Sequence, residues 1–190
     1  MTRRADEQAI MHVDSDVAFF RSFAPTDAFD GDKPRFFRAL GQTRNPMHMP
    51  WVESSCNFLG ASVPDSHAAH YIENCVLWSS DVTRAMVEQI ETHQGKPLHE
   101  AIFDASTMSE YYLYGIFADL FGQADRLAGE DVSFCNSYWP SNEVDPVDFA
   151  SLAARVTPKH CAIAVQSTHS LTLEDRSAIY ARADAELAGR

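Results

Sequence analysis

The sequence predicts an α/β fold in which a mixed sheet is flanked by helices. Short apolar runs rich in β-branched and aromatic residues alternate along the chain with stretches in which apolar residues recur at helical spacing. Such alternation is typical of a layered α/β domain. The chain has 190 residues, 45% of them hydrophobic, which suffices for one core, and no repeat or linker divides it. We therefore expect a single domain over residues 1–190.

The individual elements follow from composition and from start and stop signals. Pro50 opens a helix that Gly60 ends, and residues 79–81 cap the helix that follows the best strand. Thr172 opens the last helix, where Asp175 takes the place of the usual Glu of a capping box. The expected strands are 9–13, 33–37, 71–78, 131–135 and 161–165, and the expected helices are 50–59, 82–94, 107–121 and 172–187.

Charge and cysteine content exclude several classes of function. The chain has 27 acidic and 15 basic residues and a net charge of −12, so most of its surface repels a phosphate backbone and we expect no nucleic-acid partner. There is no apolar run long enough for a transmembrane helix, and the first residues are too polar for a secretory signal, so a cytoplasmic location is expected. The four cysteines form no C-x-x-C pair, which favours free buried thiols.

The sharpest local feature is the D-x-D sequence of Asp14 and Asp16, directly after the first expected strand. Carboxylates at this spacing share one face of a strand, and a turn after Asp14 also brings them together. Mg²⁺ and Mn²⁺ prefer such oxygen ligands and add substrate phosphate oxygens to them. The alternative interpretation is an Asx-turn that only terminates the strand.

One chemistry that begins with this pattern is that of D-x-D phosphatases of the haloacid-dehalogenase type. Their pattern ends in Thr or Val, whereas Ala18 stands at that place here. The downstream Lys and acidic pair of such phosphatases are not recognisable either. A phosphatase is therefore the weaker alternative.

The resemblance to another family extends over most of residues 9–170. The chain resembles the C-terminal half of a bacterial GT-A-type glycosyltransferase-like family that is mostly described as a domain of unknown function. The matching stretches are MHVDSDVAFF at 11–20, FDGDKPRFFR at 29–38, HMPW at 48–51, NCVLWSSDV at 74–82 and SEYYLYG at 109–115. Their order and spacing agree with the family, which is more specific than any single stretch.

The resemblance implies a GT-A-like fold and a metal-dependent glycosyltransferase that uses a nucleotide-sugar donor. Asp14 and Asp16 would hold Mn²⁺ or Mg²⁺, and the ion would neutralise charge on the diphosphate leaving group. A late histidine is often a further ligand in such enzymes; His169 is the candidate and His160 the second choice. Asn74 resembles the asparagine near the donor sugar, although a buried asparagine bonded to backbone groups explains it equally well.

The resemblance also implies an acceptor site that begins at the third expected helix, 107–121. Glu110 stands where an acidic residue often faces the acceptor and is the candidate general base of an inverting enzyme. The spacing from Thr107 to Glu110 is, however, also that of a capping box. Tyr111 and Tyr114 are candidates to stack on sugar rings, with ordinary packing as the alternative.

Only thirteen residues precede Asp14, whereas GT-A proteins place their nucleoside-binding part before the D-x-D. The chain is therefore expected to be a partial form that lacks this part and self-associates through exposed sheet edges. The alternative is a remnant without catalytic activity that serves as an interaction module on the same scaffold. The donor sugar, the acceptor and the stereochemical outcome are not readable from these residues.

Overall fold

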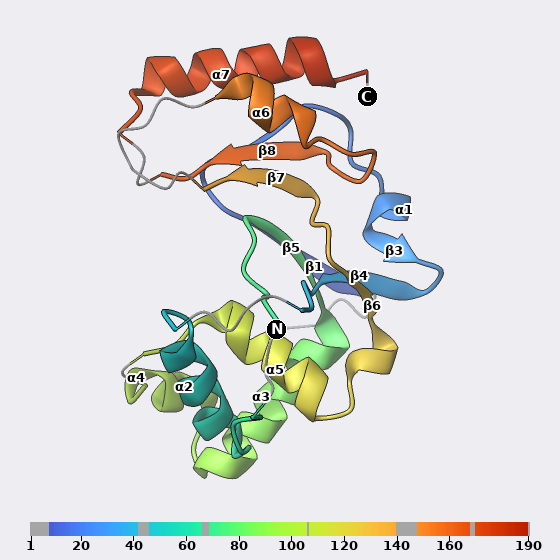
Figure 1. Cartoon of the computed structure of the whole chain (residues 1–190). Coiled ribbons are helices and arrows are strands. Elements are labelled where there is room, and N and C mark those ends of the chain that lie inside the picture. The colour runs from blue at the N-terminus through green and yellow to red at the C-terminus, as the bar shows by residue number, and fades with distance from the viewer. Residues whose placement is uncertain are drawn as a thin grey trace. The chain divides into compact units, whose positions relative to one another are not determined.

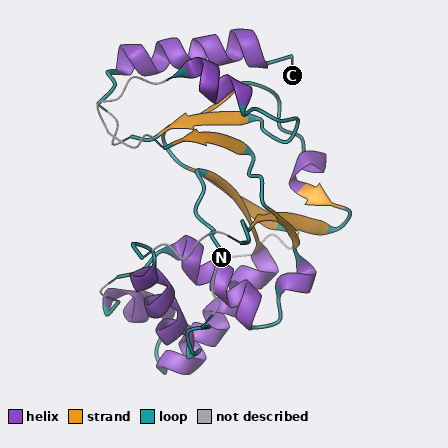
Figure 2. Cartoon of the chain, in the orientation of Figure 1, coloured by secondary structure: helices purple, strands orange, loops and turns teal. Residues whose placement is uncertain are grey.

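The computed structural model describes residues 8–41, 46–65, 69–105, 107–139, 148–167 and 170–189 (Figure 1). Helices and strands alternate along this part of the chain (Figure 2), which confirms the α/β class. The strands are β1 (Ala9–Val13), β2 (Val17–Phe19), β3 (Phe29–Asp30), β4 (Lys33–Phe37), β5 (Cys75–Ser79), β6 (Ala128–Glu130), β7 (Cys135–Tyr138) and β8 (Ala162–Val165). The helices are α1 (Pro25–Ala28), α2 (Met49–Leu59), α3 (Ser80–Gln94), α4 (Leu98–Phe103), α5 (Glu110–Leu120), α6 (Phe149–Ala154) and α7 (Leu173–Leu187), with a 3₁₀ turn at Ala124–Arg126. None of the described helices is long and apolar enough to cross a membrane.

The strands form three small sheets within the described residues. These are the pair β1-β5, the sheet β2-β8-β7 and the sheet β3-β4-β6. Both three-stranded sheets are mixed: β8 pairs with β2 antiparallel and with β7 parallel, while β4 pairs with β3 antiparallel and with β6 parallel. The expected mixed arrangement is therefore present, but it is distributed over several short sheets.

The chain divides into two compact units, and each unit draws on separate segments. Unit 1 consists of residues 1–10, 29–72 and 77–131, and unit 2 of residues 11–28, 73–76 and 132–190. Strand β5 belongs to unit 2 as far as Val76 and to unit 1 from Leu77. Because the chain passes repeatedly from one unit to the other, no linker in the sequence marks the division.

Unit 1 is built around helices α2, α3 and α5 and an aromatic core. Gly60 ends α2 with a φ of 76°, and Ser79 caps α3 by accepting a hydrogen bond from the Val82 amide. Both signals were predicted. In α5, Gly115 lies against the Tyr71 ring so closely that a Cβ atom there would overlap it. A glycine in this helix therefore serves close packing.

Unit 2 is the sheet β2-β8-β7 with α6 and α7, which cover the β7–β8 pair in Figure 1. Helix α7 begins with the predicted capping box: Thr172 accepts from the Asp175 amide, and the Asp175 carboxylate accepts from the Thr172 amide. Its far end is buried through Ala183 and Leu187 in a cluster with Phe20, Phe149, Leu152, Ala153 and Ile163.

Several expected elements differ from the structure. In place of the strand expected at 131–135, β6 ends at Glu130 and β7 begins at Cys135, and the strand expected from 71 begins only at Cys75. The helix expected from 107 begins at Glu110. The four cysteines are buried and free, as predicted. In Cys75, Cys135 and Cys161 burial raises the thiol pKa, so these thiols are unreactive packing groups.

Candidate functional site

The D-x-D residues lie on a tight turn between β1 and β2, in unit 2. The Val17 amide donates to the Asp14 carbonyl at 3.3 Å, which closes the turn. The Asp14 amide donates at 2.9 Å to the carbonyl of Asn74, so the start of the turn is fixed to the residue that precedes β5. The Asp14 side chain is exposed and that of Asp16 is half-buried. Thus two predicted site residues, Asp14 and Asn74, are direct neighbours although sixty positions separate them.

The polar atoms beside this turn are incompletely satisfied. Asn74 is only 3% exposed, and its side-chain Nδ2 is buried without a hydrogen-bond partner among the described residues. The same holds for the carboxylate atom Oδ1 of Asp16. A buried amide or carboxylate atom without a partner loses its hydration without compensation, which costs about 1–3 kcal/mol or more. Such atoms are therefore expected where a ligand supplies the missing partner.

Glu73 is a third acidic residue at this place, and sequence reasoning did not single it out. Its Oε1 accepts from the backbone N–H of Asn74 at 2.8 Å and from the Ser137 hydroxyl on β7. Burial raises the pKa of Glu73, and the nearby charge of Asp14 raises it further, while the Ser137 hydrogen bond and Arg155 oppose this shift. The sequence signal that could have identified Glu73 is its position as the charged residue within the strongly β-forming run at 71–78. A third carboxyl group, that of Glu73, therefore lies close to the D-x-D turn.

The histidines proposed as further metal ligands have different outcomes. His169 lies outside the described residues. His160 is 8% exposed, and its Nδ1 accepts the Thr157 amide at 2.9 Å, which occupies that nitrogen. His160 therefore has a structural role through Nδ1, and its part as the second-choice metal ligand stays a prediction. The described residues contain no group of three or more His, Cys, Asp or Glu side chains arranged to hold a metal ion.

The acceptor-site candidates lie in unit 1, on α5. Glu110 is the first residue of this helix and is exposed, with Ser109 at the N-cap. The capping box considered for Thr107 and Glu110 is wrong, because the third helical position is held by Tyr112. Tyr111 is half-buried and meets Trp78 edge-on, at 6.0 Å between ring centroids.

Tyr114 has no exposed ring surface, so the structure supports the packing alternative for it. Its ring stacks on Trp78 at 4.8 Å with an interplanar angle of 4°, and Phe36 meets it edge-on. Its hydroxyl accepts the Ser79 amide at 2.9 Å. A substrate cannot stack on a ring enclosed in this way, and its place as a sugar-stacking candidate is therefore withdrawn.

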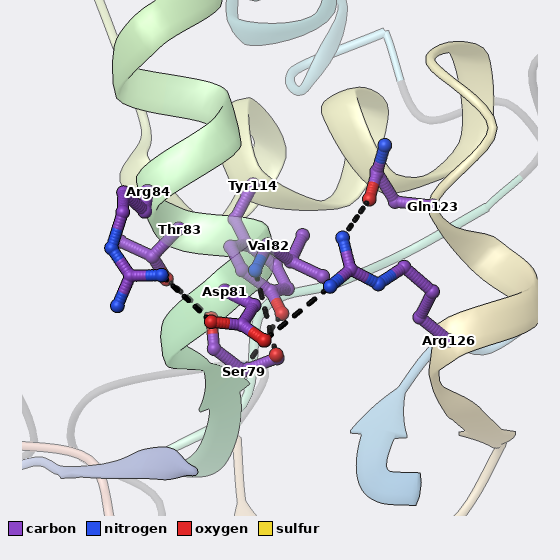
Figure 3. Close-up of polar contacts among 8 residues, drawn as sticks. All are labelled: Ser79, Asp81, Val82, Thr83, Arg84, Tyr114, Gln123 and Arg126. Carbon is purple, nitrogen blue, oxygen red and sulfur yellow. Dashed lines mark hydrogen bonds and ion pairs between the residues drawn. The ribbon is translucent and has the colours of Figure 1, made fainter. Parts of the chain in front are cut away.

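Figure 3 shows how the polar groups at the start of α3 satisfy one another in unit 1. Asp81 accepts from Arg84 at 2.7 Å and from Arg126 at 3.4 Å, and Arg126 also donates to the Gln123 side chain at 2.9 Å. The Ser79 carbonyl accepts from Thr83. The second half of the stretch 74–82 therefore builds a helix start, while its first residue, Asn74, lies at the D-x-D turn.

Comparison with known proteins adds a family but no activity. No match was found among the curated proteins or the solved structures. A sequence profile described as a family of unknown function (DUF6492) matches residues 1–179. Because the match covers nearly the whole chain, this protein belongs to the DUF6492 family.

Proposed function

We propose that this protein is a metal-dependent glycosyltransferase of the nucleotide-sugar type, and that the D-x-D turn of unit 2 is its site for the cation and the donor diphosphate. The observation that supports it most is a pair of buried atoms at the turn, Oδ1 of Asp16 and Nδ2 of Asn74, for which the described part of the chain supplies no hydrogen-bond partner. One is an acceptor that suits a cation, and the other is a donor that suits a phosphate or sugar oxygen.

The donor set fits a hard cation. Mg²⁺ and Mn²⁺ are commonly held by one or two carboxylates, with waters and phosphate oxygens completing the coordination. Asp14 and Asp16 supply two such carboxylates, and a diphosphate would supply the rest. When bound, the ion would act as a Lewis acid that stabilises the charge of the leaving diphosphate.

The chain's own residues have separate tasks in this proposal. Asn74 orients an oxygen of the sugar donor through its side-chain amide, and Glu73 holds the Asn74 backbone by accepting its N–H. His169 remains the candidate further ligand. Glu110 would accept the proton of the acceptor hydroxyl, and its exposure leaves it accessible for that task. Tyr111, half-buried beside Trp78, remains the candidate aromatic contact for the acceptor.

The test is a titration of the protein with Mn²⁺ in the presence and absence of UDP, GDP or ADP. We expect Mn²⁺ and one of these nucleotides to bind cooperatively, and the double variant Asp14→Asn with Asp16→Asn to lose this coupling. Changes of groups that only support metal ligands cost about 10–100-fold in affinity, so loss of both ligands should cost at least about 100-fold.

The chain offers a matched control in a second D-x-D, Asp30 and Asp32, which are exposed between β3 and β4 in unit 1. The double variant Asp30→Asn with Asp32→Asn removes the same charge and should leave the coupling unchanged. Equal affinity in both double variants would contradict the proposal. A parent chain without any Mn²⁺-dependent nucleotide binding would favour the non-catalytic interaction module instead.

A further inference from the structure

Two side chains of α7, Arg176 and Tyr180, contact the ends of other segments of unit 2. Residues four apart are neighbours on one face of a helix. The Arg176 guanidinium donates to the carbonyls of Val165 at 2.6 Å, Gln166 at 3.0 Å and Ser167 at 3.3 Å, at the end of β8. The Tyr180 hydroxyl donates at 2.6 Å to the carbonyl of Asp16. One helix face is therefore bonded both to the D-x-D turn and to the strand that lies beside it.

These contacts complete the attachment of the D-x-D turn. Its first residue is bonded to the Asn74 carbonyl, and its last residue, Val17, is paired with Ala164 in the β2–β8 ladder. Between these two residues, the Asp16 carbonyl accepts the hydrogen bond from Tyr180. Arg176 binds the carbonyl of Val165, which follows Ala164 in β8. The peptide and the carboxylate of Asp16 are attached to the same backbone segment, so a hydrogen bond that fixes this peptide also restricts where the carboxylate can lie.

We infer that Tyr180 and Arg176 are positioning residues that hold the D-x-D turn ready for a divalent cation and a diphosphate. This inference rests on the proposed function of the turn. A preformed turn binds its ligand more tightly, because less conformational entropy is lost on binding. A carboxylate displaced by about 1 Å can lower the rate of a reaction that depends on it by up to about 100-fold.

The attachment of α7 itself does not depend on the Tyr180 hydroxyl. The helix begins with its own capping box and ends with Ala183 and Leu187 buried in the core of unit 2. The Tyr180 ring packs against the same core. Tyr180→Phe retains this packing and removes the hydroxyl, which bonds to the Asp16 carbonyl and also to the Val165 backbone and the Arg176 side chain. Its effect is therefore expected at the turn and at the end of β8, which the turn's last residue adjoins, rather than on the folding of the unit.

The test compares Tyr180→Phe with Tyr138→Phe, since Tyr138 on β7 packs on the same core cluster and offers the same chemical change. Amide hydrogen exchange of residues 14–17 is measured without ligand, and Mn²⁺ and nucleoside diphosphate are titrated as above. We expect Tyr180→Phe to accelerate exchange at the Val17 amide and to weaken Mn²⁺-dependent binding about 10-fold. Tyr138→Phe should change neither by more than about 2-fold.

Arg176→Lys is the second variant, because lysine retains the charge but lacks the fork that reaches three carbonyls. It should accelerate exchange at residues 164–167 and weaken binding by a smaller factor. Unchanged exchange and affinity in Tyr180→Phe, or equal changes in Tyr138→Phe, would overturn the inference. If the parent protein binds no Mn²⁺ and nucleotide, the proposed function fails, whereas the exchange comparison still decides whether α7 holds the turn.

Discussion

The chain contains two D-x-D turns of identical spacing, and their surroundings are opposite. Asp30 and Asp32 flank Gly31 in the short β3–β4 hairpin of unit 1, and both are exposed. Asp14 and Asp16 lie in unit 2 on a turn bonded to Asn74 and Tyr180, where Oδ1 of Asp16 is buried without a partner among the described residues. The Asp30–Asp32 turn is fixed by the backbone conformation of Gly31, whereas the Asp14–Asp16 turn is fixed by tertiary contacts. A carboxylate pair therefore becomes a candidate site through its environment, and spacing alone does not distinguish the two turns.

The largest expected difference concerns two buried asparagines of unit 2. Asn136 donates through Nδ2 to the Leu152 carbonyl at 2.6 Å, whereas Nδ2 of Asn74 lacks a partner among the described residues. Asn136→Leu should lower the free energy of unfolding by about 1–2 kcal/mol, because it removes a short buried hydrogen bond and leaves the Leu152 carbonyl only the longer bond from the Arg155 amide at 3.3 Å. Asn74→Leu should change it by less than about 1 kcal/mol, or raise it, because it removes an unsatisfied group.

Urea unfolding of both variants, combined with the Mn²⁺ and nucleotide titration, checks this pair. Asn74→Leu should lose nucleotide coupling while its unfolding free energy is retained. Residues that serve a ligand are commonly kept at the expense of stability. A large loss of unfolding free energy in Asn74→Leu would mean that the Asn74 amide stabilises the fold. This result would contradict the predicted difference between the two asparagines.

The second prediction concerns pH and the unit that holds the Asp14 turn. Burial, followed by the charges of Arg155 and Arg21, lowers the pKa of His160 to about 4. The unfolded chain, with a histidine pKa near its usual value of about 6.5, binds the proton more readily, so stability rises with pH. Unit 2 should therefore lose stability as the pH falls from about 6.5 to about 4, by roughly 1–2 kcal/mol after allowance for solvent screening.

Amide exchange at pH 7.5 and 4.5 tests this, because the Phe20 amide after β2 donates to the Cys161 carbonyl, next to His160. Intrinsic amide exchange itself slows as the pH falls, so protection factors are compared, and the protection factor at residue 20 should decrease on acidification. His160→Asn, which can accept the Thr157 amide without titrating, should flatten the dependence. An identical pH profile in this variant would show that another group is responsible.

The third prediction separates the two ways in which the turns are fixed. Gly31 has a φ of 62°, where an L side chain is disfavoured by about 1–2 kcal/mol. Gly31→Ala should therefore lower the unfolding free energy by about 1 kcal/mol. Ser15→Ala, in the turn held by Asn74 and Tyr180, should stay within about 0.5 kcal/mol. Urea unfolding of both variants measures the difference, and equal losses would contradict the contrast.

Sequence reasoning succeeded where a local signal decides the structure. The capping box of Thr172 and Asp175 and the glycine at the end of α2 are read from a few adjacent residues, and both are present. It failed at β7, whose buried residues include Asn136 and Ser137. Their polar groups are satisfied by Leu152 and Glu73, which are distant in the sequence. A buried polar strand therefore has no apolar signature to recognise.

The candidate site shows the same limit. The D-x-D and its position at a strand end were read from adjacent residues, whereas the hydrogen bond between Asp14 and Asn74 is seen only in the structure. Glu73 and Tyr180 were missed because their contacts to the site come from tertiary packing. Tyr114 was proposed for its aromatic ring alone, and only the structure shows that Trp78 and Phe36 enclose this ring.

The smallest expected effect on stability belongs to the remaining acidic candidate, Glu110. It is exposed at the first position of α5 and takes no part in a capping box, so its charge contributes only through the helix dipole, typically about 0.3–1 kcal/mol. Glu110→Gln should therefore lower the unfolding free energy by a few tenths of a kcal/mol, and Thr107→Ala by no more. As the proposed base, however, Glu110 should matter for turnover by about 10²–10⁴-fold.

Measuring both quantities on the same variant makes the test decisive. If turnover collapses while donor affinity and unfolding are retained, Glu110 acts on the acceptor and resembles Asp14 and Asp16 in function. If turnover stays within a few-fold of the parent, Glu110 resembles Asp30 and Asp32, whose side chains are exposed and which we expect to be dispensable for binding. The environment of each carboxylate would then separate these acidic candidates, since at the proposed metal turn a carboxylate atom of Asp16 and the Asn74 amide nitrogen are buried without hydrogen-bond partners among the described residues.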